Sequence, residues 1–345
     1  TGRGVGRRRL SAATLMPRKS SSVDELYTEA KQGRRLALGR LLTMVERGGH
    51  DAEMISELAT PDAGKAHIVG ITGAPGAGKS TLTGQLVRLL AAGGRRPAVL
   101  AVDPSSPLTG GAILGDRIRM DDIVVPGADP SVAFIRSMAT RGHSGGLALA
   151  VPLAVRLFDA MGYDPVIIET VGVGQVEVDV VGAADTAVVV MTPGMGDAVQ
   201  ANKAGLLEVA DVFVVNKADR PGADDVRRDL DLMLDLSHMT GQEDAGGYRP
   251  PIVMSSALDG QGADDVWAAV EDHLRLLNET GRRAVRRRHR IRTEIRARME
   301  QTLATRIGDA MNSDMGNDLV AMVEQASLSP TAASAKLLDR LLGPR

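Results

Sequence analysis

One short stretch, residues 68–83, carries residue types that could bind phosphate. Its centre, Gly73 to Ser80, has the spacing G-x-x-x-x-G-K-S between an apolar run and a helical run. Glycines let backbone N–H groups point inward at a phosphate, and the helix that follows adds the positive end of its dipole. Lys79 would bridge the β- and γ-phosphates of a nucleotide, and the Ser80 hydroxyl would ligate Mg²⁺. The nucleotide-binding residues expected here are Gly73, Ala74, Pro75, Gly76, Ala77, Gly78, Lys79, Ser80 and Thr81.

A second motif, N-K-x-D at the end of another apolar run, indicates the base of that nucleotide. The Asp219 carboxylate can accept hydrogen bonds from the ring N–H and the exocyclic amine of guanine, whereas adenine would turn an accepting nitrogen toward it. Residues 255–257 follow the next apolar run, where a backbone N–H can meet the guanine carbonyl oxygen. The two motifs predict GTP and GDP as ligands. The residues expected around the base are Asn216, Lys217, Asp219, Ser255, Ser256 and Ala257.

Carboxylates that hold magnesium should lie at strand ends beside the phosphate loop. Asp103 ends the run "AVLAVD", and Glu169 lies near the end of "PVIIET". We expect both to hold Mg²⁺ with Ser80, and we expect Lys79 and Glu169 to take part in catalysis. A helix N-cap is an alternative role for Asp103, because Pro and Ser residues follow it.

Seven short apolar runs, many of them rich in β-branched residues, alternate with helical stretches between about Ala66 and Ser256. Continuous apolar runs are typical of strands buried on both faces, so we expect an α/β fold with a mostly parallel sheet and helices on both faces. The expected organisation is a disordered basic tail at 1–21, an N-terminal helical segment at 22–64, a nucleotide-binding domain at 65–280 and a C-terminal helical arm at 281–345. Ser22 and Glu25 form a capping-box pattern at the start of the N-terminal helical segment.

The composition narrows the classes of function. The chain has 345 residues, a net charge of -2, 24% charged residues and no cysteine, so thiolate metal sites and a Cys nucleophile are excluded. Only 2% of residues are aromatic, which disfavours the stacking platforms of single-stranded nucleic-acid binding. We expect a cytoplasmic protein, although the Arg- and Ser-rich start also resembles an organellar presequence.

Residues 282–307 form a basic amphipathic pattern. Nine arginines lie between Arg282 and Arg298, while Ile291, Ile295, Met299, Leu303 and Ile307 recur every four residues. Such a helix could bind a membrane surface or nucleic acid. We prefer the alternative in which the apolar stripe packs on the domain or on a second subunit while the arginines face water. Neither a nucleic acid nor a membrane is expected as a partner.

Several longer stretches resemble the MeaB/ArgK/MMAA family of GTPases: "GAPGAGKST", "AVDPSSPLTGGAILGDRIRM", "SMATRGHSGGLA", "ETVGVGQVEVDV", "PGMGDAVQANKAG" and "NKAD". The resemblance spans roughly Lys65 to Asp272. It implies a P-loop NTPase fold of the SIMIBI type, with N- and C-terminal helical extensions and a C-terminal arm that forms a homodimer.

The same resemblance implies three switch segments. In the first, Asp116 would reach the magnesium and the attacking water and so be both catalytic and metal-binding. In the second, Gly172 would sense the γ-phosphate, with Gln175 in the same "VGVGQ" run. In the third, Asp197 and Lys203 match a partner-responsive switch.

Members of this family attend adenosylcobalamin-dependent acyl-CoA mutases, chiefly methylmalonyl-CoA mutase, by gating cofactor loading, protection and reactivation. The resemblance therefore implies a slow, partner-stimulated GTPase chaperone. The chain lacks the D-x-H-x-x-G run of cobalamin binders, so cobalamin should be bound by the partner. Two alternatives are a metal-delivery GTPase of the same superfamily, which the lack of cysteine disfavours, and a transport-associated ATPase or kinase, which N-K-x-D disfavours. A related mutase, such as one acting on isobutyryl-CoA or ethylmalonyl-CoA, is a further possible client.

Overall fold

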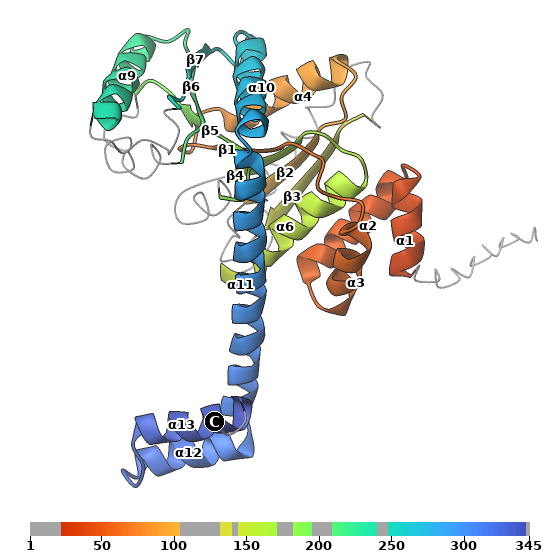
Figure 1. The fold of residues 1–345 in the computed structure, drawn as a ribbon, viewed down its shortest axis with the longest axis vertical. Coiled ribbons are helices and arrows are strands. Elements are labelled where there is room, and N and C mark those ends of the chain that lie inside the picture. Colours follow the sequence, from red (N-terminus) through yellow and green to blue (C-terminus); the bar gives the residue numbers. More distant parts are fainter. Residues whose placement is uncertain are drawn as a thin grey trace, which may run out of the picture.

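A computed structural model of the chain describes residues 22–103, 132–139, 144–170, 182–194, 209–239 and 248–342. Its centre is a seven-stranded sheet with the order β3-β2-β4-β1-β5-β6-β7, in which each paired neighbour is parallel (Figure 1). The strands are β1 (Ile68–Thr72), β2 (Ala98–Asp103), β3 (Phe134–Ala139), β4 (Val166–Thr170), β5 (Thr186–Met191), β6 (Val212–Asn216) and β7 (Ile252–Ser255). Each of the seven apolar runs contains a strand, so the predicted α/β fold class is confirmed.

Helices cover both faces of the sheet, because alternate residues of a buried strand point to opposite sides. The covering helices are α4 (Lys79–Ala92), α6 (Ser144–Ala160), α9 (Ala223–Met239) and α10 (Ala263–Glu279). Helices α4 and α10 share a core with Val69 and Val188 on one face. On the other face, α6 packs with Ile168 and α9 packs with Phe213. The sheet is therefore a buried middle layer.

Three helices precede the sheet: α1 (Val23–Lys31), α2 (Arg35–Arg47) and α3 (His50–Ala59). The capping box at α1 is present, with the Glu25 N–H donating to Ser22 Oγ at 3.2 Å and the Ser22 N–H donating to Glu25 Oε2 at 3.1 Å. The apolar side chains of these helices belong to the same core cluster as α6. The N-terminal helices therefore pack on the sheet domain and extend its core.

The C-terminal arm leaves the sheet domain as one long helix and ends in a hairpin (Figure 1). Helix α11 (Arg282–Met311) has 30 residues and so spans about 45 Å. Helices α12 (Asp314–Glu324) and α13 (Pro330–Leu342) follow it, and Pro330 is the first residue of α13, where proline's missing N–H is tolerated. Among the residues that the structure describes, no helix combines the length and apolar character needed to cross a bilayer.

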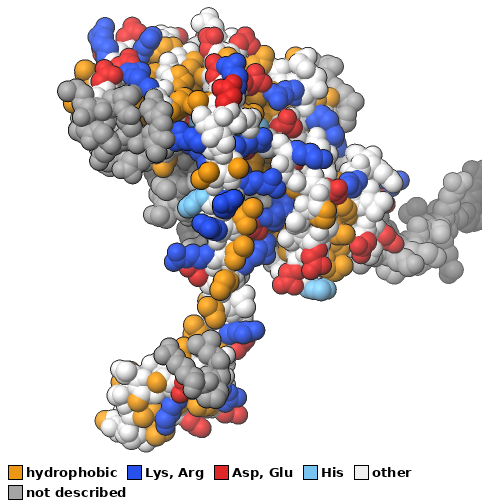
Figure 2. Space-filling view, in the orientation of Figure 1, with side chains coloured by type: hydrophobic (Ala, Val, Ile, Leu, Met, Phe, Trp, Pro, Cys, Tyr) orange, Lys and Arg blue, Asp and Glu red, His pale blue; other side chains and the backbone are white. Residues whose placement is uncertain are grey.

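The arm carries the apolar stripe that the sequence predicts. Figure 2 shows it as a line of hydrophobic side chains along the arm. Ile295 is 54% exposed and Met299 is 60% exposed, so the stripe does not pack within this chain. The expectation that the arginines face water is wrong for three of them: the side chains of Arg283, Arg286 and Arg290 are only 26%, 30% and 16% exposed. They turn inward because buried carboxylates of the sheet domain lie beneath them.

Candidate functional site

The phosphate loop joins β1 to α4, as the motif requires. Gly73 has φ +141°, and a Cβ there would lie 2.1 Å from the Val190 carbonyl oxygen of the adjacent strand. Gly78 has φ +90°, and a Cβ there would lie 2.3 Å from Asn216 Nδ2. Both positions need glycine for backbone conformation and for space. The loop therefore packs closely against the ends of β5 and β6. These strands lie on the side of β1 where the base site is predicted.

Lys79 lies inside the loop and is 6% exposed. Its Nζ donates to the carbonyl oxygens of Gly73 at 2.5 Å and Ala74 at 3.1 Å. The positive charge is thus held within the curve formed by the loop backbone. An ammonium group placed there is suited to an anion bound by the same loop.

Ser80 is the second residue of α4, and its hydroxyl donates to the Glu169 carboxylate. Glu169 is fully buried in β4. Asp103 is the last residue of β2, and the preceding Val102 pairs with Thr170, so β2 and β4 bring both acids to one edge of the sheet. Mg²⁺ prefers hydroxyl and carboxylate oxygens, so these residues fit the predicted magnesium site.

Asn216 connects the phosphate loop to the segment after β7. It is 2% exposed, and its Nδ2 donates to the Ala77 carbonyl oxygen at 2.8 Å. Its Oδ1 accepts the Ala257 N–H at 3.0 Å. Lys217 has φ +58° and its Nζ donates to the Gly76 carbonyl oxygen at 2.7 Å. Both residues therefore shape the site by holding the phosphate loop, which sequence reasoning did not anticipate.

Asp219 follows Asn216 and Lys217 and is exposed, so the base of a nucleotide could reach it. The Ser256 hydroxyl lies 3.1 Å from Asp219 Oδ1 and 2.7 Å from Asp259 Oδ2. A hydroxyl has one hydrogen, so Ser256 can orient one of these carboxylates at a time. The backbone N–H groups of Ser256 and Ala257 donate to Gln261 and Asn216, so both already have partners within the protein.

The remaining predicted residues fall into two groups. Pro75, in the phosphate loop, and Thr81, in the first turn of α4, are exposed, and the Ser255 hydroxyl donates to the Gln261 carbonyl oxygen at 3.0 Å. The switch residues lie outside the described part of the chain, and they are Asp116, Gly172, Gln175, Asp197 and Lys203. The structure thus brings together the phosphate loop, the N-K-x-D motif and the segment 255–257.

A second polar cluster, at the opposite edge of the sheet, was missed from the sequence. Asp185 and Asp211 immediately precede β5 and β6. Arg286 of α11 bonds both carboxylate oxygens of Asp211, at 2.7 and 2.8 Å. Arg290 and Arg283 contact Asp185 at 2.6 and 3.5 Å. We call these five residues the arm clamp. The available signal was an Asp directly before each of two apolar runs, "DTAVVV" and "DVFVVN".

A buried hydrogen-bond chain adjoins the arm clamp. His67 Nε2 and His273 Nδ1 each lie 2.9 Å from the Thr186 hydroxyl oxygen, and His273 Nε2 lies 3.2 Å from Asp211 Oδ1. If His273 donates from Nε2 to Asp211, its Nδ1 accepts from Thr186, which in turn accepts from His67 Nε2. Burial lowers the pKa of His67 to about 4, so its ring is neutral near pH 7.

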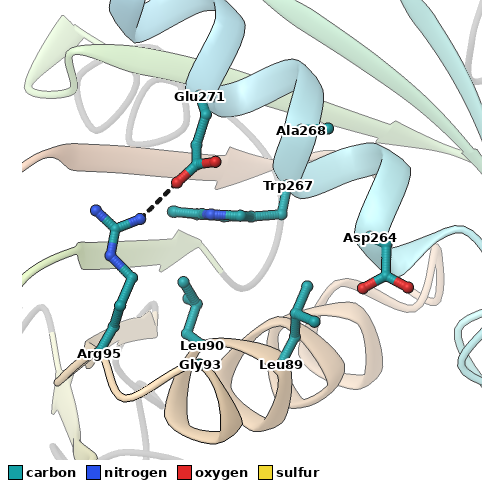
Figure 3. A pocket seen from close by; sticks show the side chains of 8 residues that line it. All are labelled: Leu89, Leu90, Gly93, Arg95, Asp264, Trp267, Ala268 and Glu271. Atoms are coloured by element: carbon teal, nitrogen blue, oxygen red, sulfur yellow. Dashed lines mark hydrogen bonds and ion pairs between the residues drawn. The ribbon is translucent and has the colours of Figure 1, made fainter.

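A pocket of about 280 Å³ lies between α4 and α10 (Figure 3). Trp267 stands over Leu89 and Leu90, and Arg95 bonds Glu271 at 2.6 Å across one end. Leu89 and Leu90 lie in the last turn of α4 and Arg95 lies just beyond it, whereas the phosphate loop precedes the N-terminal end of α4. The pocket is therefore separate from the predicted nucleotide site.

The fold and the site define the class of protein. A parallel sheet with a glycine loop between β1 and α4, and with N-K-x-D starting at the last residue of β6, is the arrangement of a P-loop protein of the GTPase type. The family described as "Methylmalonyl Co-A mutase-associated GTPase MeaB" matches residues 38–312, and the chain belongs to that family. The resemblance seen in the sequence is thereby confirmed.

Individual relatives agree with this assignment. A putative GTPase of Pyrococcus horikoshii is 45% identical over 321 residues, which are 93% of this chain and 99% of the relative. A fused isobutyryl-CoA mutase of Cupriavidus metallidurans is 42% identical over 202 residues, 57% of this chain and 18% of the relative. A crystal structure described as an LAO/AO transport system kinase is similar with a TM-score of 0.65 and 27% identity, over 97% of this chain and 99% of that one.

Proposed function

We propose that this chain hydrolyses GTP to GDP and phosphate, and that it uses this cycle to chaperone an adenosylcobalamin-dependent acyl-CoA mutase. The observation that carries the nucleotide assignment is the position of Asp219. Its carboxylate lies within reach of Ser256, on the side of the phosphate loop where Asn216 joins that loop to Ala257. A carboxylate in this place accepts the two donors of guanine and disfavours adenine.

The residues that would contact the phosphates of GTP support the proposal that the chain hydrolyses it. Lys79 would neutralise charge on the β- and γ-phosphates, and Ser80, Asp103 and Glu169 would hold Mg²⁺. Bound Mg²⁺ supplies further neutralisation of phosphate charge. Asp116 is proposed to complete this set and to orient the attacking water.

Hydrolysis is proposed to be slow in the isolated chain, because no described residue is placed as an arginine finger. The partner would accelerate it by reshaping the switch segments, through Gly172 and Gln175 near the γ-phosphate and through Asp197 and Lys203 in the third segment. GTP would then act as a clock that limits how long the chaperone holds its client.

The proposed partner is a mutase, most simply methylmalonyl-CoA mutase. The description of the family supports this partner. The relative named a fused isobutyryl-CoA mutase contains a region similar to 202 residues of this chain, which supports direct association between the two kinds of protein. The mutase, rather than this chain, would bind cobalamin and acyl-CoA, and the chain would gate loading, protection and reactivation of that cofactor.

A homodimer is proposed as the working form. The stripe of Ile291, Ile295, Met299, Leu303 and Ile307 is between 43% and 60% exposed along α11. Sustained exposure of aliphatic side chains on one helix face favours burial against another subunit.

Phosphate release from GTP and Mg²⁺ tests the proposal, measured with and without the host's methylmalonyl-CoA mutase. A slow basal rate and a clear rise with the mutase are expected, and Lys79→Ala should remove both. Isobutyryl-CoA mutase serves as a second client in a parallel assay. Absence of stimulation and of complex formation with either mutase would refute the chaperone role, while loss of GTP turnover itself would refute the GTPase assignment.

A further inference from the structure

Gln85 connects the helix of the phosphate loop to the segment next to the predicted base site. It lies on α4, and its Nε2 donates to the Ala257 carbonyl oxygen at 2.9 Å. We propose that Gln85 is a positioning residue that sets the affinity for the guanine base by fixing the Ala257 peptide group. This inference rests on the proposed GTPase function and adds to it a residue that lies outside both nucleotide motifs.

The backbone of Ala257 is held on both sides of its α-carbon. Asn216, at the end of β6, accepts the Ala257 N–H, and Gln85 donates to the Ala257 carbonyl oxygen. Ala257 itself is 2% exposed, so these polar atoms have little access to water. A buried carbonyl that loses its donor is costly, and the local backbone would shift to recover one.

The direction of the Gln85 amide follows from its partner. A carbonyl oxygen only accepts hydrogen bonds, so the nitrogen of the amide must face Ala257. Gly260 lies beside the whole amide group, because a Cβ there would lie 3.6 Å from Gln85 Oε1 and 3.7 Å from Gln85 Nε2. Glutamate has the same shape as glutamine, but at neutral pH it cannot donate and it carries a negative charge, so Gln85→Glu replaces the donor with a group that repels the carbonyl oxygen, whereas Gln85→Leu removes the donor without adding charge.

Ala257 is coupled to the residue that would read the base. Its neighbour Ser256 lies within hydrogen-bond distance of Asp219, and the Ser256 N–H donates to Gln261 at 3.0 Å to close the turn. A shift of the Ala257 carbonyl therefore moves Ser256 relative to Asp219. Gln85 is six positions after Lys79, less than two turns along α4. One helix therefore carries a residue of the phosphate site and a residue that contacts the segment beside the predicted base site.

Three variants of the full chain test this role: Gln85→Glu, Gln85→Leu, and Gln301→Leu as a control on the exposed face of α11. A fluorescent GDP analogue gives the Kd and the dissociation rate of the nucleotide. Competition by tripolyphosphate, which has no base, measures the affinity of the phosphate-binding residues alone. Loss of one hydrogen bond predicts about two- to tenfold weaker GDP binding for Gln85→Leu, and the added charge should make the loss at least as large for Gln85→Glu. The loss should come mainly from faster dissociation while tripolyphosphate binding stays at the wild-type value, and the freed Ala257 carbonyl should lower the unfolding temperature of the nucleotide-free chain only slightly.

Two results would overturn the inference. Unchanged GDP affinity in both Gln85 variants would show that the Ala257 contact does not matter for the base. Equal losses for GDP and tripolyphosphate would place Gln85 in general stability instead. In either case the wild-type chain still binds GDP, so the GTPase proposal stands; failure of the wild-type chain to bind GDP would remove both.

Discussion

Arg286 holds Asp211 with both nitrogens of its guanidinium group, at 2.7 and 2.8 Å. Asp211 also accepts the Ala187 N–H at 2.8 Å, so one carboxylate joins α11 to the strands β5 and β6. Its side chain is 6% exposed, which strengthens these charge-assisted bonds. The base of the long arm is therefore fixed to the sheet domain at the edge opposite the phosphate loop.

Asp211→Asn should loosen the arm and destabilise the chain. The change removes a buried charge while Arg286 stays partly buried, so we expect a loss of about 3 kcal/mol in the free energy of unfolding. Urea denaturation measures that loss, and limited proteolysis within α11 reports loosening of the arm. Arg296→Gln is the matched control, because Arg296 pairs with Glu300 on an exposed turn of the same helix. Equal stability of the Asp211 variant and the control would contradict a structural role for the arm clamp.

His67 should make stability depend on pH between about 6.5 and 4. Burial lowers the pKa of His67 in the folded chain to about 4, while the unfolded chain binds this proton near its ordinary value of 6.5. The unfolded state therefore gains protons first, and stability falls as the pH drops through this window, by about 3 kcal/mol for this group alone. His67→Gln keeps a donor for Thr186 and does not titrate, so its stability curve should be flatter. The exposed His50 provides the control variant His50→Gln, and an identical slope in all three proteins would rule out the assignment.

Asp219→Asn should change the base preference from GTP toward XTP. The variant loses an acceptor for the guanine amine and gains an amide N–H that can donate to the second carbonyl oxygen of xanthine. Competition of GTP and XTP against a fluorescent GDP analogue measures the change. Retention of the wild-type preference for GTP would show that Asp219 does not read the base.

Lys79→Ala should abolish retention of GTP and GDP. The Lys79 ammonium group donates to the Gly73 and Ala74 carbonyl oxygens of the phosphate loop, whereas the Lys217 ammonium group donates to the Gly76 carbonyl oxygen at 2.7 Å, where the loop is exposed. Isothermal titration with GTP and Mg²⁺ measures the loss, and circular dichroism checks that the fold is kept. A normal titration curve would refute the phosphate-site assignment.

The double variant Ile295→Lys, Met299→Lys should convert a dimer into monomers. Both side chains lie on the exposed stripe, so the change leaves the core of the sheet domain and the arm clamp in place. Two charges in an apolar interface prevent its burial. Sedimentation equilibrium measures the mass, and Gln301→Lys on the exposed surface of the same helix is the control. A dimer that survives the double variant would place the interface elsewhere.

Much of the nucleotide site could be predicted from the sequence because its determinants are local. The glycines of the phosphate loop, Lys79 and Ser80 follow one another along the chain, and N-K-x-D occupies four consecutive positions. The strands were visible as continuous apolar runs, since a strand buried on both faces has no polar side to alternate with.

The roles of several residues could not be predicted in this way. Asn216 was expected at the base, and instead it joins Ala77 to Ala257, two positions that are far apart in the sequence. Gln85 looks like any polar residue of an amphipathic helix until the segment after β7 is placed beside α4. These contacts join segments from different parts of the chain, so no local pattern encodes them.

The sequence by itself determined the nucleotide chemistry, the parallel sheet and the basic, striped helix, because each depends on spacing along the chain. Only the tertiary structure decided where the arginines of that helix go. Arg286 and Arg290 meet Asp211 and Asp185 because parallel strands begin at one edge of the sheet, which gathers two carboxylates from separate segments beneath α11. Burial among such charges stabilises the arginines on the protein side of the helix, whereas composition alone predicts a solvated basic face.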